Sequence, residues 1–570
     1  MRKTLLLAAL GSVPMLLSAQ TAMDAYNASR SDLKGTARFM SMGGAFGALG
    51  GDLSTLSQNP GGIGVYRSSE IGFTLDLDCQ HSASESQGFR MTDNQTKFLL
   101  NNIGGVATLR LGSSVCPNIN LGFTYNKAVS FNRRYAGVVP QLFNSLSNYI
   151  AGIANANELT VGDVQTSDNY DPYNPNDGGY QAPWLSILGY DSYLISPVGN
   201  RDYPQWVGQW SQGTSGVGSF SVQEQGGVDE YNIAIGGNIS NTVYWGMNFD
   251  ITGMNYTRDS YWGESLQNAV IDNDGSFENT ASDWNLHNYY HLSGTGFKYS
   301  IGVIVKPIQE LRIGLAFHTP TWYNLTESFY AATSCNYSAM REGAVSATTN
   351  NREMAYNDFS LRTPCKLTAS LAGVIGGRFI ISADYEWQPY HAMHIGERSY
   401  SYYDGGYWGD DYYDDGWWGW GAPAKTQAPK ATRASVYEPY YYENQDIKEY
   451  FTSTNTLRLG AEMRVTNQFS VRAGYSFVSS PVKERVRDNQ TMVATGLTPS
   501  YQLDNTTNYV TCGLGYRIKA FSVDLAYVYK HQSASFHAYP SDPESPLIPS
   551  PQSKLSLDNS QVVLSCGLRF

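Results

Sequence analysis

Few side chains in this sequence of 570 residues stand at the spacing of a catalytic or metal site. His391 and His394 have a spacing that metal ligands use, but no carboxylate or cysteine motif completes a set around them. The acidic, aromatic run 401–421 lacks the spaced ligands and the fixed glycine of a calcium loop, and is interpreted as a surface loop. No serine stands in a nucleophile elbow. We therefore expect neither an enzyme nor a metal or cofactor.

A second kind of chemistry is suggested by charged residues that alternate with apolar ones. Arg458, Glu462 and Arg472 do so in the segments 454–465 and 468–478. Side chains alternate between the two faces of a strand, so an apolar face on lipid would turn these charges into a barrel lumen. Pairing across the turn then places Glu462 opposite Arg472. The luminal charges either neutralise one another or bind a ligand carboxylate. The candidates for carboxylate binding are Lys298, Arg312, Arg472 and Arg517.

These charges belong to a set of fourteen segments of about ten residues that alternate apolar and polar residues, as membrane-spanning strands do. In 242–254, Met247, Phe249 and Ile251 alternate with polar neighbours. The predicted strands are 69–78, 103–111, 119–131, 228–238, 242–254, 294–306, 309–318, 364–376, 378–388, 454–465, 468–478, 507–518, 521–530 and 560–570.

The connections between these segments alternate between short turns and long loops. Short ones include 239–241 and 466–467, whereas 132–227 and 389–453 are long. Bacterial barrels have short periplasmic turns and long external loops, and an even strand number returns the chain to the side where it started. The sequence therefore predicts an all-β protein, a fourteen-stranded antiparallel transmembrane barrel over residues 69–570, with both termini in the periplasm.

The glycine-rich segment 35–67 precedes the first predicted strand. No strand stands before its glycines, which excludes a dinucleotide loop, and Arg38 and Asp52 bracket too short an apolar run for a membrane helix. Glycine allows tight turns and close backbone approach. The segment is thus expected to form a compact plug in a confined space.

This segment resembles a known family. Its run MGGAFGALGGD followed by NPGG is similar to the N-terminal hatch of the FadL family, outer-membrane channels for long-chain fatty acids and other hydrophobic compounds. LRLGAEMRVTNQFSVRAGYSF and YVTCGLGYRIKAFSVDLAYVYK resemble the family's closing hairpins. The resemblance implies a hatch, residues 20–68, inside a fourteen-stranded barrel. The family's Asn-Pro-Ala signature reads Asn-Pro-Gly here. The hatch and gating residues that it implies are Gly43, Gly44, Asn59, Pro60 and Gly61.

An amphipathic helix is predicted in the first very long loop, within residues 138–153, because apolar residues recur there at i, i+3 and i+4. This stripe either packs on the core of its own loop or forms a landing groove for ligand, as the long external loops of the FadL family do. The residues of the candidate groove are Leu142, Phe143, Leu146, Tyr149, Ile150 and Ile153.

Composition sets further bounds. Residues 1–19 have the basic start, apolar run and small-residue boundary of a cleaved signal peptide, and no later apolar stretch reaches the length of a membrane helix. A net charge of −12 argues against a nucleic-acid partner. Six scattered cysteines form no CxxC pair, so they signal no zinc site, and any disulfide pairing is open.

Together these patterns predict a monomeric, multi-pass outer-membrane protein for passive uptake of hydrophobic small molecules such as long-chain fatty acids. Its partners would be that ligand, outer-membrane lipids and the barrel assembly machinery, since the terminal Phe570 resembles the signal that this machinery reads. The alternative is a surface protein without transport that uses aromatic loops for adhesion. The substrate is open, because fatty acids, aromatic hydrocarbons and porphyrin-like compounds would all suit an apolar pocket with few polar groups.

Overall fold

The structure is a computed structural model. It describes residues 21–165, 182–273, 276–337, 344–349, 353–398, 440–488, 493, 495–541 and 550–570. The predicted signal peptide, 1–19, and the acidic run 401–421 lie outside these residues.

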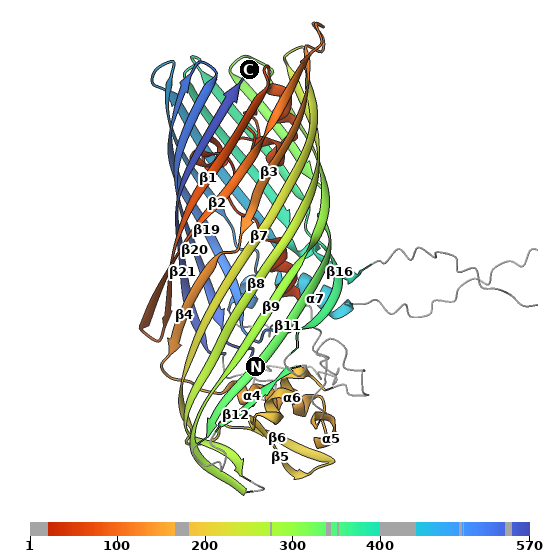
Figure 1. Cartoon of the computed structure of the whole chain (residues 1–570), viewed down its shortest axis with the longest axis vertical. Coiled ribbons are helices and arrows are strands. Elements are labelled where there is room, and N and C mark those ends of the chain that lie inside the picture. The colour runs from red at the N-terminus through yellow and green to blue at the C-terminus, as the bar shows by residue number, and fades with distance from the viewer. Residues whose placement is uncertain are drawn as a thin grey trace, which may run out of the picture.

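Fourteen antiparallel strands form a closed ring (Figure 1). Each strand pairs with its two neighbours, and the last, β21, pairs with the first, β1. The ring consists of β1 (Glu70–Ser86), β2 (Phe89–Arg110), β3 (Asn118–Ser130), β7 (Ser215–Ile239), β8 (Val243–Asn273), β9 (Ser276–Val305), β10 (Leu311–His318), β14 (Lys366–Ile375), β15 (Phe379–Pro389), β17 (Ser453–Arg464), β18 (Phe469–Val478), β19 (Tyr501–Ile518), β20 (Phe521–His537) and β21 (Gln552–Arg569). The predicted fold class is confirmed, since each predicted strand overlaps one of these.

The short turns gather at one end of the barrel, here called the turn end, where the C-terminus also lies (Figure 1). The register of β17 and β18 places Glu462 opposite Arg472, as the pairing across the turn predicts. The end with the longer connections is called the far end.

Several predicted loops are instead continuations of the strands. The predicted loop 255–293 is the far part of the β8–β9 ladder, and 79–102 is the far part of β1 and β2, which turn at Gln87 and Gly88. The reason is a change in which face is apolar. In β8 the outward face carries Met247 and Ile251 near the turn end, whereas beyond Gly253 the buried, inward residues are the apolar ones. The alternation continues with its two faces exchanged.

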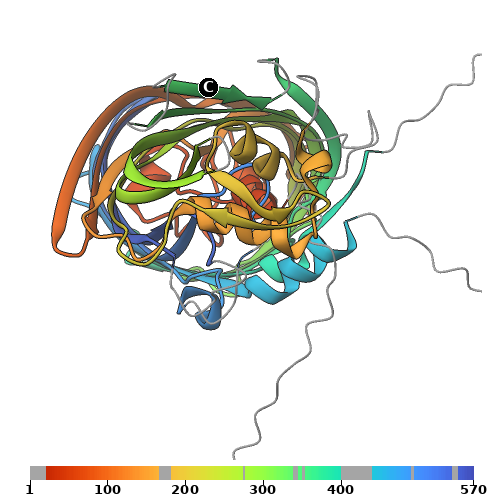
Figure 2. The ribbon, with the colours of Figure 1, turned by 90° about the horizontal axis from the view of Figure 1, so that it is seen from below.

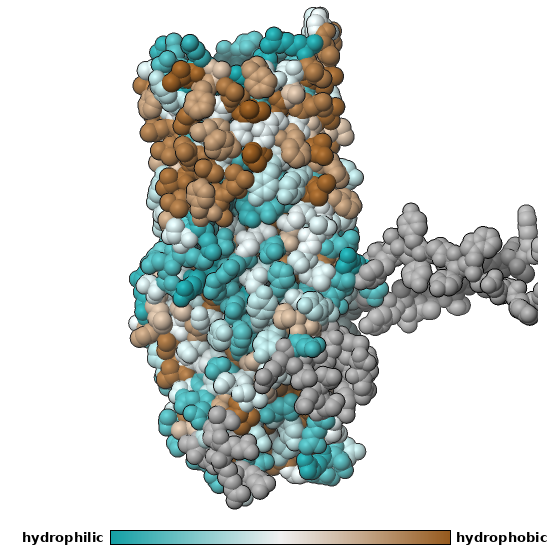
Figure 3. Space-filling view, viewed as in Figure 1, coloured by the Kyte–Doolittle hydropathy of each residue, from teal (hydrophilic) through white to brown (hydrophobic). Residues whose placement is uncertain are grey.

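On the face that Figure 3 shows, the turn-end half of the barrel is apolar and gives way to a polar surface toward the far end. Exposed large apolar side chains occur on each of the fourteen strands, so this surface is a belt. In β8 the belt occupies residues 243–253. At about 3.3 Å per residue and a tilt of about 40°, these eleven residues span about 28 Å. A bilayer's hydrocarbon core is about 30 Å thick. The belt therefore identifies the membrane-spanning part, and the remaining twenty or so residues of β8 extend beyond it.

The N-terminal hatch lies inside the ring. It consists of α1 (Ala22–Ser29), α2 (Ala37–Ser41), α3 (Thr55–Gln58) and the 3-10 helix η1 (Pro60–Val65). Tyr26 of α1 stacks on Phe451 and meets Tyr390 in the far half, while η1 contacts β7, β8 and β9 near their turn ends. The chain thus runs along the lumen toward the turn end. The residues before Thr21 are outside the described part, so the location of the N-terminus stays a prediction.

A cap covers the far end of the lumen (Figure 2). It follows β4 (Arg133–Val139) and consists of α4 (Leu146–Ala156), α5 (Val161–Val164), α6 (Trp184–Asp191) and the hairpin of β5 (Ile195–Asn200) and β6 (Tyr203–Gly208). Ser145 caps α4 by accepting the N–H of Ser147. The predicted helix within 138–153 is therefore present, and it begins at Leu146.

The wall of the far half is completed by shorter elements. They are β11 (Trp322–Tyr337), β12 (Ala344–Thr348), β13 (Ala355–Arg362), η3 (Tyr390–Ala392), β16 (His394–Glu397), α7 (Tyr441–Tyr450) and α8 (Glu484–Arg487). Of the helices in the described ranges, none is long and apolar enough to cross a bilayer. All six cysteines are free thiols.

Candidate functional site

Asn59 and Pro60 start the helix at the turn end of the hatch. The Asn59 Oδ1 accepts the N–H of Gly61 at 3.0 Å, and its Nδ2 donates to the carbonyl oxygen of Gly47 at 2.5 Å. Pro60 occupies the first position of η1, where its fixed φ suits the helix and its missing N–H costs nothing. The pair therefore ties two turns of the hatch together.

Glycines in the barrel wall make room for the hatch. A Cβ on Gly302 would lie 1.9 Å from the Asn59 Oδ1, and one on Gly246 would lie 2.0 Å from the Pro60 carbonyl oxygen. Nine strands carry a glycine of this kind, at Gly72, Gly122, Gly236, Gly246, Gly302, Gly314, Gly460, Gly474 and Gly513. Because these positions follow the circumference, the hatch is fitted to the wall on nearly every side.

Gly43 and Gly44 need glycine for two reasons. Their φ angles are +63° and +76°, which L side chains rarely adopt. In addition, a Cβ on Gly43 would lie 2.9 Å from the backbone of Tyr475, and its N–H donates to the Thr511 Oγ1 at 3.0 Å. These implied hatch residues thus hold a turn directly against β18 and β19.

Buried ion pairs join the hatch to the wall. Lys34 is 1% exposed and lies 2.7 Å from Asp76 and 3.3 Å from Asp78 of β1. Arg38 of α2 lies 2.9 Å from Glu462 of β17. Removing one partner of a buried pair costs about 3–5 kcal/mol, because the other charge is left without compensation. The lumen is therefore closed at the turn end by a firmly held plug.

The four predicted carboxylate-binding cations fall into two groups. Arg472 is held by Glu462 at 2.7 Å and Asp524 at 2.6 Å, and Lys298 pairs with Glu230. Of the two alternatives for the luminal charges, mutual neutralisation in ion pairs describes these two side chains. Arg312 donates to the Leu49 carbonyl oxygen at 2.6 Å, and within the described ranges neither Arg312 nor Arg517 has a carboxylate partner.

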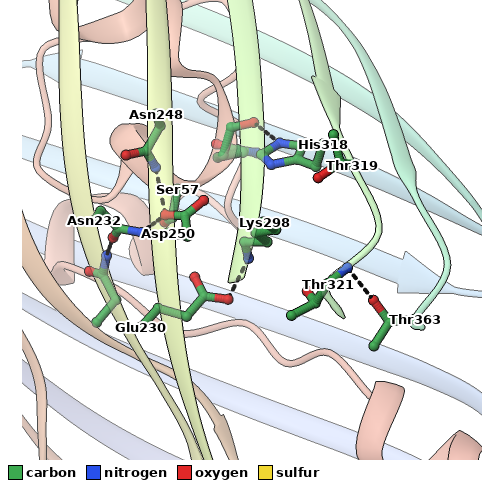
Figure 4. Close-up of polar contacts among 12 residues, drawn as sticks. Ser57, Glu230, Asn232, Asn248, Asp250, Lys298, His318, Thr319, Thr321 and Thr363 are labelled. Carbon is green, nitrogen blue, oxygen red and sulfur yellow. Dashed lines mark hydrogen bonds and ion pairs between the residues drawn. The ribbon is translucent and has the colours of Figure 1, made fainter. Parts of the chain in front are cut away.

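A polar cluster surrounds Lys298 where the hatch meets β7, β8 and β9 (Figure 4). Asp250 accepts hydrogen bonds from the amides of Asn232 and Asn248, and the Asn248 amide also donates to the carbonyl oxygen of Leu56 in the hatch at 3.0 Å. On the neighbouring wall, the His318 Nε2 is 2.9 Å from the carbonyl oxygen of Gln58. The cluster joins hatch and wall, and its charged groups already have partners.

The predicted ligand groove is closed. Leu142, Leu146, Tyr149, Ile150 and Ile153 are at most 5% exposed and belong to the core of the cap, and Phe143 alone is exposed, at 57%. Of the two alternatives for this stripe, packing on the core of its own loop describes the structure, because α6 and the β5–β6 hairpin cover it, and it forms no open groove in this conformation.

A different hollow lies on the outer surface of the cap, here called the outer groove. It has a volume of about 370 Å³ and lies between α4, the β5–β6 hairpin and the β8–β9 hairpin. Its apolar lining includes Ala151, Val198, Trp210, Val270 and Phe277.

Aromatic side chains fill the interior of the far half. Phe220 stacks on Phe536 with ring centroids 4.1 Å apart, and Tyr135 meets both edge-on. This packing is continuous with the cap on one side and with α1 on the other. A largely apolar interior, with buried charges at Glu224, Arg133 and Arg258, therefore extends from the cap to the hatch.

The barrel wall is split between β2 and β3. Their ladder ends at Asn102 and Asn126 within the described residues, and the part of β2 before Asn102 pairs only with β1. β4 turns inward instead, where Ser82 of β1 donates to the carbonyl oxygen of Arg134 at 2.6 Å. Asn126 pairs with Glu230 of β7, which in turn pairs with Thr252 of β8. The split therefore begins at the edge of the apolar belt.

The aromatic interior and the split are the features that the sequence prediction missed. The signal for the aromatic interior is the exchange of faces after Gly253, which makes Tyr256, Trp262 and Leu266 buried and inward. An alternation scored with the apolar face always outward does not detect it.

A closed barrel with an apolar belt and a seated internal plug defines a plugged transmembrane β-barrel. No family model matches the sequence, and no curated protein matches it. Among solved structures, the chain is similar to a Pseudomonas aeruginosa FadL homologue over 95% of its own length and 100% of that chain, with a TM-score of 0.49 and 11% identity. It is also similar to the Pseudomonas putida toluene transporter TodX, over 95% and 99% of the two chains (TM-score 0.44, 12% identity), and to the CymD monoaromatic hydrocarbon channel, over 94% and 98% (TM-score 0.42, 10% identity).

Proposed function

We propose that this protein is an outer-membrane channel for the passive uptake of hydrophobic small molecules, with long-chain fatty acids as one candidate class. The observation that carries the proposal is the continuous, largely apolar interior between cap and hatch. A pore for polar solutes would be expected to have a polar, water-filled lumen. The turn end faces the periplasm in this proposal, because short turns do so in bacterial barrels.

The ligand is taken from outside at the outer groove, where Trp210 and Phe277 offer an apolar surface. Each buried methylene contributes about 0.8 kcal/mol, so a chain of roughly fourteen contributes about 11 kcal/mol before ordering costs. An exposed charge pair adds only about 0–1 kcal/mol. The apolar part of the ligand should therefore decide its capture.

This expectation is tested by uptake of radiolabelled compounds of increasing chain length into cells that produce the protein. Replacing Trp210 and Phe277 with Ser should slow the uptake of long chains much more than that of short chains. Tyr203→Ser is the matched control, since Tyr203 lies on the β5–β6 hairpin beside the groove but is 86% exposed and does not line the groove. Uptake no faster than in cells without the protein would favour the surface-display alternative.

The hatch is the gate in this proposal. Its tight fit means that a ligand can pass the turn end only if the hatch moves, whereas the split between β2 and β3 offers a lateral exit past a seated hatch. A small cavity of about 70 Å³ lies beside the hatch, between Tyr26, Val129 of β3 and Tyr509 of β19.

A disulfide that fixes the hatch to the wall separates these exits. Gly47 of the hatch and Ser370 of β14 are suitable positions, because a Cβ on Gly47 would lie 3.0 Å from the Ser370 Cβ, about 0.5 Å short of the disulfide range. In a chain with its natural cysteines replaced by Ser, Gly47→Cys with Ser370→Cys should stop uptake when oxidised and restore it when reduced. Uptake that persists in the oxidised form would assign the exit to the split.

Topology is tested by adding protease to intact cells. Cleavage should occur within 132–227 and 389–453, which the proposal places outside the cell, while the turn at Thr466 and Asn467 should stay intact. Cleavage confined to the short turns would mean the opposite orientation.

A further inference from the structure

A cavity of about 590 Å³ lies at the turn end, between the hatch and the wall, and is here called the vestibule. It is at the opposite end of the lumen from the outer groove, so it is a separate site from the one that the proposed function assigns to ligand capture. Its most frequent lining residue is arginine. The seven arginines are Arg38, Arg67, Arg312, Arg464, Arg472, Arg517 and Arg569.

Carboxylates compensate only part of this positive charge. Glu462 and Asp524 pair with Arg38 and Arg472, and Glu70 pairs with Arg569. The other four arginines have no ion-pair partner within the described part of the chain: Arg67, Arg312, Arg464 and Arg517. The whole chain has a net charge of −12, so this concentration of arginine runs against the composition of the protein.

Two of these guanidinium groups are available for further contacts. Arg312 uses its Nη1 for the Leu49 carbonyl oxygen, whereas its buried Nε has no hydrogen-bond partner. Arg517 is exposed and forms no hydrogen bond or ion pair with another described side chain. Apolar residues such as Val65 and Ile380 line the wall beside them.

This chemistry selects a particular kind of anion. Several uncompensated guanidinium groups in one cavity exceed the single charge of a carboxylate, and the planar fork of arginine matches the oxygens of phosphate in a bidentate arrangement. The volume is within the range of about 300–1,000 Å³ of small-molecule sites. We propose that the vestibule is a binding site for a phosphate group, carried either by a small soluble phosphate compound or by the headgroup of an anionic phospholipid.

Titration of the purified full-length protein with inorganic pyrophosphate tests the soluble source. Arg464→Gln with Arg517→Gln removes two exposed, unpaired cations without touching the hatch contacts. A hydrogen bond to a charged group contributes about 1.5–3 kcal/mol, so affinity should fall at least about tenfold. Arg485→Gln is the control with the same loss of charge per residue, because Arg485 lies on α8 in the far half and pairs with Glu449 at the surface. Its affinity should equal that of the unchanged protein.

The lipid source is tested by native mass spectrometry after reconstitution in nanodiscs of phosphatidylcholine with phosphatidylglycerol. Retained phosphatidylglycerol that is lost in the double variant would support the proposal with a headgroup as the source, and pyrophosphate binding lost in that variant would support it with a soluble source. Unchanged heat-modifiable migration shows that the double variant still forms the barrel. The proposal is overturned if the unchanged protein binds neither probe saturably, or if the double variant binds both as tightly.

Discussion

The two halves of the barrel have opposite polarity. In the turn-end half the outward face of β8 is apolar at Met247 and Ile251, and the inward face carries Asn248 and Asp250. In the far half the outward face is polar, and Trp262 points inward with 4% exposure. One continuous strand therefore serves two environments, lipid outside in the first half and water outside in the second.

This difference separates what each half contributes. The turn-end half holds the hatch by close glycine contacts and buried charges, which suits a position-specific closure. The far half has an interior of interdigitated aromatic rings, and its buried ion pairs, of Glu224 with Arg133 and Arg30, lie beside α1. An apolar ligand can take the place of aromatic rings more readily than that of a buried ion pair. We therefore expect the ligand to be held in the far half and the lumen to be closed in the turn-end half.

The largest effect is expected from removing a ring inside the far half. Phe220→Ala should lower the free energy of unfolding by about 3–5 kcal/mol, because it leaves a cavity and removes the stack on Phe536. Tyr356→Ala, at a ring that is 65% exposed in the same half, should cost less than about 1 kcal/mol. Urea unfolding of both variants gives the comparison. Equal losses would show that the far half has no true core.

A charge placed outward tests the boundary between the halves. Met247→Arg puts a cation near the middle of the apolar belt and should cost about 2–4 kcal/mol. Ser265→Arg makes the matching change on the same face of β8 beyond the belt, and should stay within about 0.5 kcal/mol. Folding into lipid vesicles with urea titration measures both. If Ser265→Arg proved as costly, the belt would extend farther than the surface indicates.

Loosening the hatch should leave the wall intact. Replacing Asn59 and Pro60 with Ala removes the hydrogen bonds to Gly61 and Gly47, at about 1–2 kcal/mol. Hydrogen exchange over 37–65 should speed up while heat-modifiable migration is unchanged. Asn94→Ala, on the exposed part of β2, should change neither. Failure of the double variant to assemble would make the motif part of barrel folding rather than of closure.

The smallest effect concerns α7, outside the membrane. Burial raises the pKa of Asp446 to about 6, with Glu443 and Glu449 adding to the shift. Since the folded pKa exceeds the unfolded one, near 3.9, folding favours the protonated form. The helix should therefore be most stable at low pH and lose stability as the pH rises from about 4 to about 6. Hydrogen exchange of α7 against pH measures this, and Asp446→Asn should abolish the dependence. A dependence of opposite sign would contradict the assignment.

The part of the fold that meets lipid was predictable, because lipid imposes one rule on every strand. That rule gave the strand number, the pairing of Glu462 with Arg472 and the inward direction of Lys298. It could not give the partners of the luminal charges. Alternation along a strand tells which face a side chain lies on, but not which residue lies next to it. The pairing of the arginines also depends on the path of the hatch through the lumen. The hatch has no regular alternation of apolar and polar residues from which this path could be predicted.

The far half escaped prediction for another reason. Where water replaces lipid outside the wall, the apolar residues lie on the inward face instead of the outward one. A search for strands with an apolar outward face therefore stops at this point, although the strand continues. The burial of the candidate groove could not be predicted for a similar reason. Amphipathic spacing located the helix at Leu146, but an apolar stripe has the same spacing whether ligand or α6 covers it.

The seating of the hatch also has a consequence for the order of folding. The hatch is covalently continuous with β1 and touches strands on nearly every side, so its contacts with the wall are complete only once the ring is closed. Closure joins Glu70 to Arg569, 499 residues apart, so the seam between β1 and β21 has the greatest loop-closure entropy to overcome and should form last.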